Sequence, residues 1–124
     1  MSIDVGAKAP DFTLMNQDRQ PVTLSEQLKQ GPVVLAFFPA AFSSVCTKEM
    51  CTFRDAASEL NNVKATVLGV SVDTFFAQKA WADAQHLNFP LLSDFNKTVI
   101  RQYDVVNPDM IGLKDIAKRA VFVI

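Results

Sequence analysis

Cysteine, histidine and glycine are scarce in this sequence, and each shortage excludes a class of protein. Two cysteines in 124 residues are too few for a disulfide scaffold or for a metal site of four thiols. A single histidine, His86, leaves little from which to build a metal site, so we expect neither a metal nor a cofactor. The four glycines form no Gly-x-Gly-x-x-Gly arrangement and no phosphate-binding loop.

Long apolar runs and an excess of one charge are also missing. The longest apolar stretch, from Pro32 to Phe42, is too short to cross a bilayer and contains a second proline. Residues 1–6 show no basic segment followed by an apolar one, so we expect no secretory signal and a cytoplasmic protein. Twelve Lys and Arg against thirteen Asp and Glu give a net charge of −1, which offers no electrostatic basis for binding nucleic acid.

What the chain does contain is typical of one folded unit. Apolar residues make up 49% of the composition and charged residues 20%, as in globular proteins. No linker, charge block or repeat divides the sequence, so we expect a single domain over residues 1–124.

Apolar strands and amphipathic helices alternate along the chain. Residues 12–14 and 22–24 predict an N-terminal β-hairpin, and mainly apolar runs predict buried strands at 33–38, 66–72 and 120–124. A short strand or extended link is expected at 89–92. The spacing of apolar residues predicts one long helix from Ser43 or Ser44 through Leu60, another from Asp73 or Thr74 through Gln85, and a short one over 96–103. This order predicts an α/β fold with helices on both faces of a mainly parallel sheet.

Cys46 follows a predicted buried strand and lies in the first turn of the next predicted helix. Free backbone N–H groups and the positive end of the helix dipole stabilise an anion there, and the thiolate is the nucleophilic form of cysteine. The position therefore indicates a reactive thiol. The alternative is a buried apolar cysteine, because Cys46 shares an apolar stripe with Met50 and Phe53.

No histidine base is evident for this thiol, because His86 follows a predicted helix and is typical of a turn. A neighbouring arginine is the remaining means of activation. Arg54, Arg101 and Arg119 are the candidates, and Arg119 alone directly precedes a predicted buried strand.

The residues around Cys46 also form a known motif. Pro39, Ser43 and Cys46 match the Pro-x-x-x-(Thr/Ser)-x-x-Cys motif of the peroxiredoxins, the thiol peroxidases of the alkyl hydroperoxide reductase C/thiol-specific antioxidant superfamily. Segments 6–14, 37–39, 69–73, 89–94 and 119–124 agree with this family in the same order. The sequence therefore resembles a peroxiredoxin, with features of the bacterioferritin comigratory protein (PrxQ) and AhpE-like groups.

This resemblance implies a thioredoxin-like fold and a role for each motif residue. Cys46 is expected to attack the peroxide and become a sulfenic acid, Pro39 to shield the thiolate, and Ser43 to orient the peroxide. Arg119 is expected to hold the thiolate and the substrate oxygens, with the backbone N–H groups of Val45 and Cys46 completing the oxygen site. Glu49 is expected either to orient the arginine or to be a solvated helix carboxylate.

Cys51 lies five residues after Cys46, as in the PrxQ group, where the second cysteine resolves the sulfenic acid. In an intact helix the two Cα atoms are about 8–9 Å apart, beyond the roughly 7 Å that a disulfide allows. Cys51 is therefore either inert packing, or the start of the helix unwinds during each turnover.

The predicted function is a thiol peroxidase for hydrogen peroxide and organic hydroperoxides, resolved by Cys51 or an external thiol. Thioredoxin or a similar dithiol donor is the expected reductant, and the protein is expected to be a monomer or homodimer. The alternative is a non-enzymatic peroxide sensor or thiol–disulfide exchange protein of the same fold. Family members usually continue beyond the Arg119 strand with another strand and a helix, so we expect a C-terminally truncated form that is less stable or associates through an open sheet edge.

Overall fold

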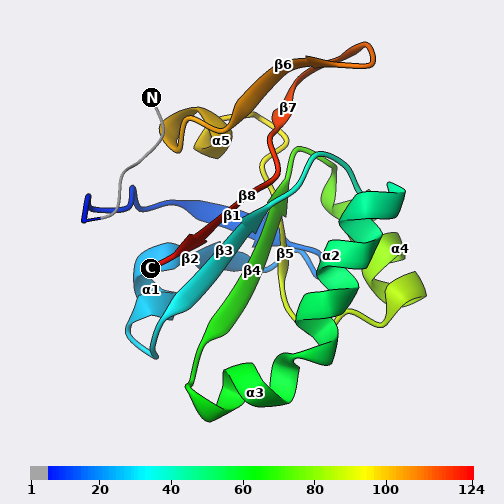
Figure 1. Ribbon diagram of the computed structural model, residues 1–124. Helices are drawn as coiled ribbons and strands as arrows, with labels where there is room; N and C mark the ends of the chain where they lie inside the picture. Colours follow the sequence, from blue (N-terminus) through cyan, green and yellow to red (C-terminus); the bar gives the residue numbers. More distant parts are fainter. Residues whose placement is uncertain (1–5) are drawn as a thin grey trace.

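A six-stranded sheet forms the centre of the molecule (Figure 1). The computed structural model describes residues 6–124, apart from the side chains of Ser58 and Asn61. The expectation that residues 1–6 form no secretory signal therefore falls almost entirely outside the described residues. The strands lie in the order β2-β1-β5-β4-β3-β8. Their bounds are Thr13–Asn16 (β1), Pro21–Thr23 (β2), Val33–Phe37 (β3), Thr66–Ser71 (β4), Leu91–Ser93 (β5) and Ala120–Val123 (β8).

The middle of the sheet is parallel, as the sequence predicted. β3 pairs with β4, and β4 with β5, in the parallel direction, whereas β1 and β8 are antiparallel to their neighbours. Every residue of β3 is buried because helices cover both of its faces, which explains its unbroken apolar sequence. The carboxyl ends of β3 and β4 consequently meet at one edge of the sheet, where the candidate site lies.

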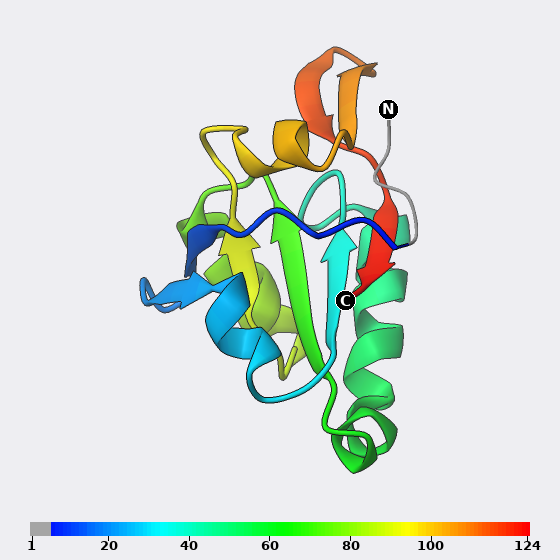
Figure 2. The same ribbon diagram turned by 90° about the vertical axis from the view of Figure 1, so that its left-hand side faces the viewer.

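Helices cover both faces and divide the core into two clusters. On one face, α1 (Leu24–Leu28) and α5 (Val99–Gln102) pack against Leu35 and Phe37 in what we call the α1/α5 cluster. On the other, α2 (Ser44–Asp55) and α4 (Phe75–Gln85) pack against Ala36 and Phe38 in the α2/α4 cluster. Figure 2 shows α1 and α5 on the near side of the sheet and α4 behind it. Alternate residues of β3 thus belong to opposite clusters.

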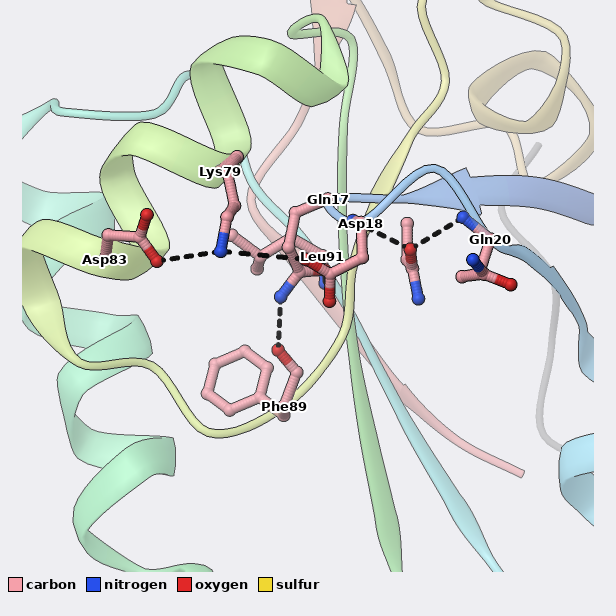
Figure 3. A network of polar contacts seen from close by, with 8 residues as sticks. Gln17, Asp18, Gln20, Lys79, Asp83, Phe89 and Leu91 are labelled. Atoms are coloured by element: carbon pink, nitrogen blue, oxygen red, sulfur yellow. Dashed lines mark hydrogen bonds and ion pairs between the residues drawn. The ribbon is translucent and has the colours of Figure 1, made fainter.

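The predicted N-terminal hairpin is confirmed, and its turn is fastened to the rest of the molecule. β1 and β2 pair antiparallel, and Gln17 in the turn donates to the carbonyl of Phe89 and accepts from the N–H of Leu91. Lys79 of α4 lies between Asp83 and Asp18 of the turn (Figure 3). These contacts attach the hairpin to both α4 and the beginning of β5.

The single long helix predicted after Ser43 is wrong, because the chain forms two helices. α2 ends at Asp55, and α3 (Ala57–Asn62) follows after Ala56, which leaves the helical conformation with ψ near 6°. The side-chain amide of Asn88 donates to the carbonyl of Arg54, an acceptor that a continuous helix uses for itself. The apolar spacing continued across this break because both helices turn apolar residues to the same cluster.

A second hairpin, which the sequence did not predict, joins α5 to β8. Its strands are β6 (Val106–Met110) and β7 (Leu113–Ala117), and it projects beyond the main sheet (Figure 1). Ile111 and Gly112 form the two-residue turn with φ of 46° and 89°, a conformation for which Asn-Gly is the usual signal. A β-branched residue with positive φ is uncommon, so the turn was not recognisable.

Two other expectations need correction. The helix expected over 96–103 is limited to Val99–Gln102, because the buried carboxylate of Asp94 accepts the N–H groups of Thr98, Val99 and Ile100 and thereby sets where the helix begins. The strand expected to be buried at the end of the chain, β8, is an edge strand. Ala120 and Phe122 pack against the α1/α5 cluster, whereas Val121 and Val123 point to the opposite face and are 48% and 76% exposed.

Candidate active site

Cys46 lies where the first turn of α2 meets the sheet. Ser43 is in the N-cap position with an extended backbone, its carbonyl accepts the N–H of Thr47, and Cys46 is the third residue of the helix. The Cys46 side chain is fully buried in the α2/α4 cluster, and its thiol is free. The sulfur therefore sits at the positive end of a twelve-residue helix and away from bulk water.

Arg119 is the arginine that reaches this cysteine. Its Nη2 donates to Cys46 Sγ at 3.7 Å. Sheet register explains the contact, because Ala120 pairs with Phe37 at the end of β3 and so places Arg119 beside the loop that leads to α2. The other two candidates bind elsewhere: Arg54 pairs with Asp55, and Arg101 pairs with Asp115.

Glu49 contacts the same guanidinium. Its Oε2 lies 3.5 Å from Arg119 Nε, and only 21% of its side chain is exposed, so it is not a solvated helix carboxylate. Burial raises the pKa of Glu49 above its ordinary value, and the charge of Arg119 opposes this shift without cancelling it. Its Oε1 is buried and accepts no hydrogen bond from the residues that the structure describes.

Pro39 and Ser43 belong to the loop between β3 and α2. Pro39 is buried, and the Ser43 hydroxyl donates to the carbonyl of Ala40 at 3.0 Å instead of capping the helix. Phe42 between them has a φ of 67° and a side chain that is 57% exposed. The loop thus makes a tight turn that presents an apolar ring beside the start of α2.

Cys51 is not brought to Cys46. Both cysteines lie in the unbroken helix α2, whose geometry keeps their Cα atoms about 8–9 Å apart. The Cys51 thiol is instead 3.6 Å from Oε1 of Gln85, at the end of α4. A disulfide between the two cysteines requires α2 to unwind.

Two site residues were not assigned from the sequence. The carboxylate of Asp73 accepts the N–H of Ala41 at 2.7 Å, and the hydroxyl of Thr47 accepts the indole N–H of Trp81 at 3.1 Å. A signal for Asp73 did exist, since it is an acidic residue just after a buried parallel strand. Trp81 itself is buried core. His86 is exposed and follows the end of α4 in the left-handed conformation, which agrees with the prediction that it lies in a turn.

The part of the chain that the structure describes shows neither a membrane span nor a metal site. None of its helices is long and apolar enough to cross a bilayer. Within the same residues, no three His, Cys, Asp or Glu side chains are grouped so that they could hold a metal ion.

A buried cysteine at a helix start, beside an arginine on an α/β sheet, defines a thiol-dependent redox protein of thioredoxin-like fold. Residues 5–124 match the model of the AhpC/TSA family, and the chain belongs to that family. The predictions of a peroxiredoxin, of its fold and of an enzyme of the peroxidase class are therefore confirmed.

Relatives and solved structures agree with this family. The chain is 42% identical to a putative peroxiredoxin of Mycobacterium tuberculosis over 96% of its own length and 77% of that protein. It is 40% identical to alkyl hydroperoxide reductase E of Mycobacterium bovis, covering 98% of this chain and 78% of the relative. The crystal structure of peroxidoxin BcpB from Mycobacterium tuberculosis superposes with a TM-score of 0.89 at 42% identity, over 96% of this chain and 77% of that one.

Proposed function

We propose that this chain reduces hydrogen peroxide and organic hydroperoxides through Cys46. The observation that supports the proposal is the position of the Cys46 sulfur, buried in the first turn of α2 with Arg119 Nη2 at 3.7 Å. A cation and a helix N-terminus both favour negative charge, so the two features together suit a thiolate and a developing oxyanion.

In the first step, the Cys46 thiolate attacks the terminal oxygen of the hydroperoxide. The S–O bond forms as the O–O bond breaks, and the electron pair leaves on the second oxygen, which takes a proton from solvent to become water or an alcohol. The sulfur is oxidised to a sulfenic acid and the peroxide is reduced by two electrons. Arg119 and the N–H groups of Val45 and Cys46 would stabilise the charge on the departing oxygen.

The remaining motif residues would prepare the site for this attack. Glu49 would hold the Arg119 guanidinium at Nε, 3.5 Å from its Oε2. Pro39 would keep water from the thiolate, and Ser43 would rotate its hydroxyl from the Ala40 carbonyl toward the peroxide. Phe42 and Val45, both exposed, precede Cys46 in the sequence and would favour the alkyl part of an organic hydroperoxide.

In the second step, Cys51 or an external thiol would attack the Cys46 sulfenic acid. A disulfide forms, and the hydroxyl of the sulfenic acid leaves as water. Resolution by Cys51 needs the first turns of α2 to unwind, because the intact helix separates the two residues. Thioredoxin or a similar dithiol would then reduce the disulfide. We further propose that this chain forms a single domain over residues 1–124, acts in the cytoplasm and is a monomer or homodimer.

Peroxide consumption with a dithiol reductant tests the role of Cys46. We expect Cys46→Ser to abolish turnover, and Cys51→Ser to keep the first oxidation step. Comparing hydrogen peroxide, organic hydroperoxides and peroxynitrite would establish the preferred substrate. Full peroxidase activity in Cys46→Ser would overturn the proposal.

Mass spectrometry after one equivalent of peroxide tests the role of Cys51. We expect an intramolecular Cys46–Cys51 disulfide in the wild type and a trapped sulfenic acid in Cys51→Ser. A sulfenic acid that persists in the wild type beside a free Cys51 would show that an external thiol resolves it.

A further inference from the structure

We propose that Asp73 is a positioning residue for peroxide reduction, because its carboxylate fixes the loop that carries Pro39 and Ser43 to the start of α2. The inference rests on the proposed function of Cys46. It assigns to this site a residue that neither touches the reacting atoms nor belongs to the cysteine motif.

The contact itself joins two loops at the carboxyl ends of parallel strands. β3 and β4 run side by side, and the segments that follow them, toward α2 and α4, lie at the same edge of the sheet (Figure 1). There the N–H of Ala41 donates to Asp73 Oδ2 at 2.7 Å. Ala41 lies midway between Pro39 and Ser43, so this bond holds the loop at its centre.

The backbone next to this bond needs such support. Phe42 is not a glycine, yet it has a φ of 67°, and left-handed backbone is unfavourable for a residue with a bulky side chain. A strained turn persists only where its surroundings determine it. The bond from Ala41 to Asp73 acts on the residue directly before the turn.

Asp73 is itself held from several directions. The Ser71 hydroxyl donates to the same Oδ2 at 2.7 Å, and buried Gln78 of α4 donates to Ser71 Oγ at 3.0 Å and to the carbonyl of Leu92 at 2.8 Å. The Ser93 hydroxyl donates to the carbonyl of Asp73 at 2.6 Å. β4, β5 and α4 thus place one carboxylate oxygen against the loop.

Thr74, and not Asp73, caps the following helix. Its hydroxyl oxygen accepts the N–H of Ala77 at 3.2 Å, which leaves the Asp73 carboxylate free to face the loop. Because Ser43 and the N–H groups of Val45 and Cys46 continue directly from that loop, a shift at Ala41 is expected to misalign them with the peroxide.

The test compares two substitutions at the same position. Asp73→Asn can put its amide oxygen in place of Oδ2 and so keep both accepted hydrogen bonds, whereas Asp73→Ala removes them. We expect Asp73→Ala to lower the second-order rate constant of Cys46 oxidation by roughly 10- to 100-fold. Asp73→Asn should stay within about threefold of the wild type, and Asp83→Ala, an exposed change on α4, should have no effect.

Hydrogen exchange of the peptide containing Ala41 provides a readout that does not depend on peroxide. Exchange should accelerate in Asp73→Ala and not in Asp73→Asn. If the wild type failed to react with peroxide, the proposed function would fall, while accelerated exchange would still show that Asp73 holds the loop.

Two results would overturn the positioning role: a wild-type oxidation rate in Asp73→Ala, or an equal loss in Asp73→Asn. If Asp73→Ala does not fold, Ser71→Ala takes its place, because it removes the hydroxyl that orients Oδ2. We expect that variant to oxidise at least threefold more slowly than the wild type, and an unchanged rate would equally refute the proposal.

Discussion

At the scale of single residues, Glu49 combines a buried carboxyl with a cationic neighbour. Burial raises its pKa above the ordinary 4.5 although Arg119 lies 3.5 Å away, so the folded protein holds this proton more tightly than the unfolded chain does. The stability linked to this proton is complete below the unfolded pKa near 4.5 and is lost as the pH rises through the higher folded pKa. Ionisation of Glu49 therefore lowers the free energy of unfolding.

Glu49→Gln should remove this pH dependence. Above pH 4.5 the free energy of unfolding of the wild type should fall relative to that of the variant, because only the wild type ionises at this position. Urea denaturation of both proteins at a series of pH values measures the difference. Glu59→Gln, an exposed change on α3, serves as the matched control. A constant difference between wild type and Glu49→Gln across this range would contradict the prediction.

The placement of single residues could be predicted from the sequence where it depends on the elements next to them in the chain. Cys46 follows a buried strand and a cap residue, so its place at a helix start was readable, and Arg119 was singled out because it directly precedes a strand. Asp73 and Gln85 acquire their contacts only when separate segments come together. No pattern within the sequence specifies that Ala41 meets Asp73 or that Cys51 meets Gln85.

At the scale of helices and strands, an element was predictable from the sequence where it is buried in the core. β3 and β4 were recognisable because both of their faces are covered, which requires continuous apolar sequence. At the break between α2 and α3, the carbonyl of Arg54 accepts from Asn88, a residue far along the chain. The β6–β7 hairpin has little core and turns at Ile111-Gly112, so it carried neither an apolar pattern nor the usual turn residues.

At one position of β4 an added side chain would have to displace a neighbour. A Cβ at Gly69 would lie 2.8 Å from Cδ2 of Leu91 and 3.5 Å from Sδ of Met50, between β5 and α2. Gly69→Ala should therefore lower the free energy of unfolding by about 1–3 kcal/mol, measured by urea denaturation. The cause is overpacking against Leu91, so a smaller side chain at position 91 should relieve it.

Leu91→Ala tests that cause. Alone, it should destabilise by about 2–5 kcal/mol because it leaves a cavity. Combined with Gly69→Ala, the loss should be smaller than the sum of the two by roughly 0.5–3 kcal/mol, since the added methyl occupies the vacated space. Simple additivity would show that the two side chains do not compete for that space.

At the scale of the whole molecule, the two hydrophobic clusters are built on the same strands. Leu35 and Phe37 face the α1/α5 cluster, whereas Ala36 and Phe38 face the α2/α4 cluster. If these strands unfold, the apolar side chains of both clusters become exposed. The unfolding of the two faces should therefore be coupled.

The chain contains one tryptophan and one tyrosine, and they lie on opposite faces. Trp81 is buried in the α2/α4 cluster, and Tyr103 is buried in the α1/α5 cluster, where its hydroxyl donates to the carbonyl of Pro10 at 2.6 Å. Urea unfolding followed by Trp81 fluorescence and by Tyr103 absorbance should give the same midpoint. Ile100→Ala on one face and Met50→Ala on the other should each cost about 2–5 kcal/mol and move both midpoints together. If Ile100→Ala moved the Tyr103 transition and left that of Trp81 in place, the faces would unfold separately, and the shared strands would not couple them.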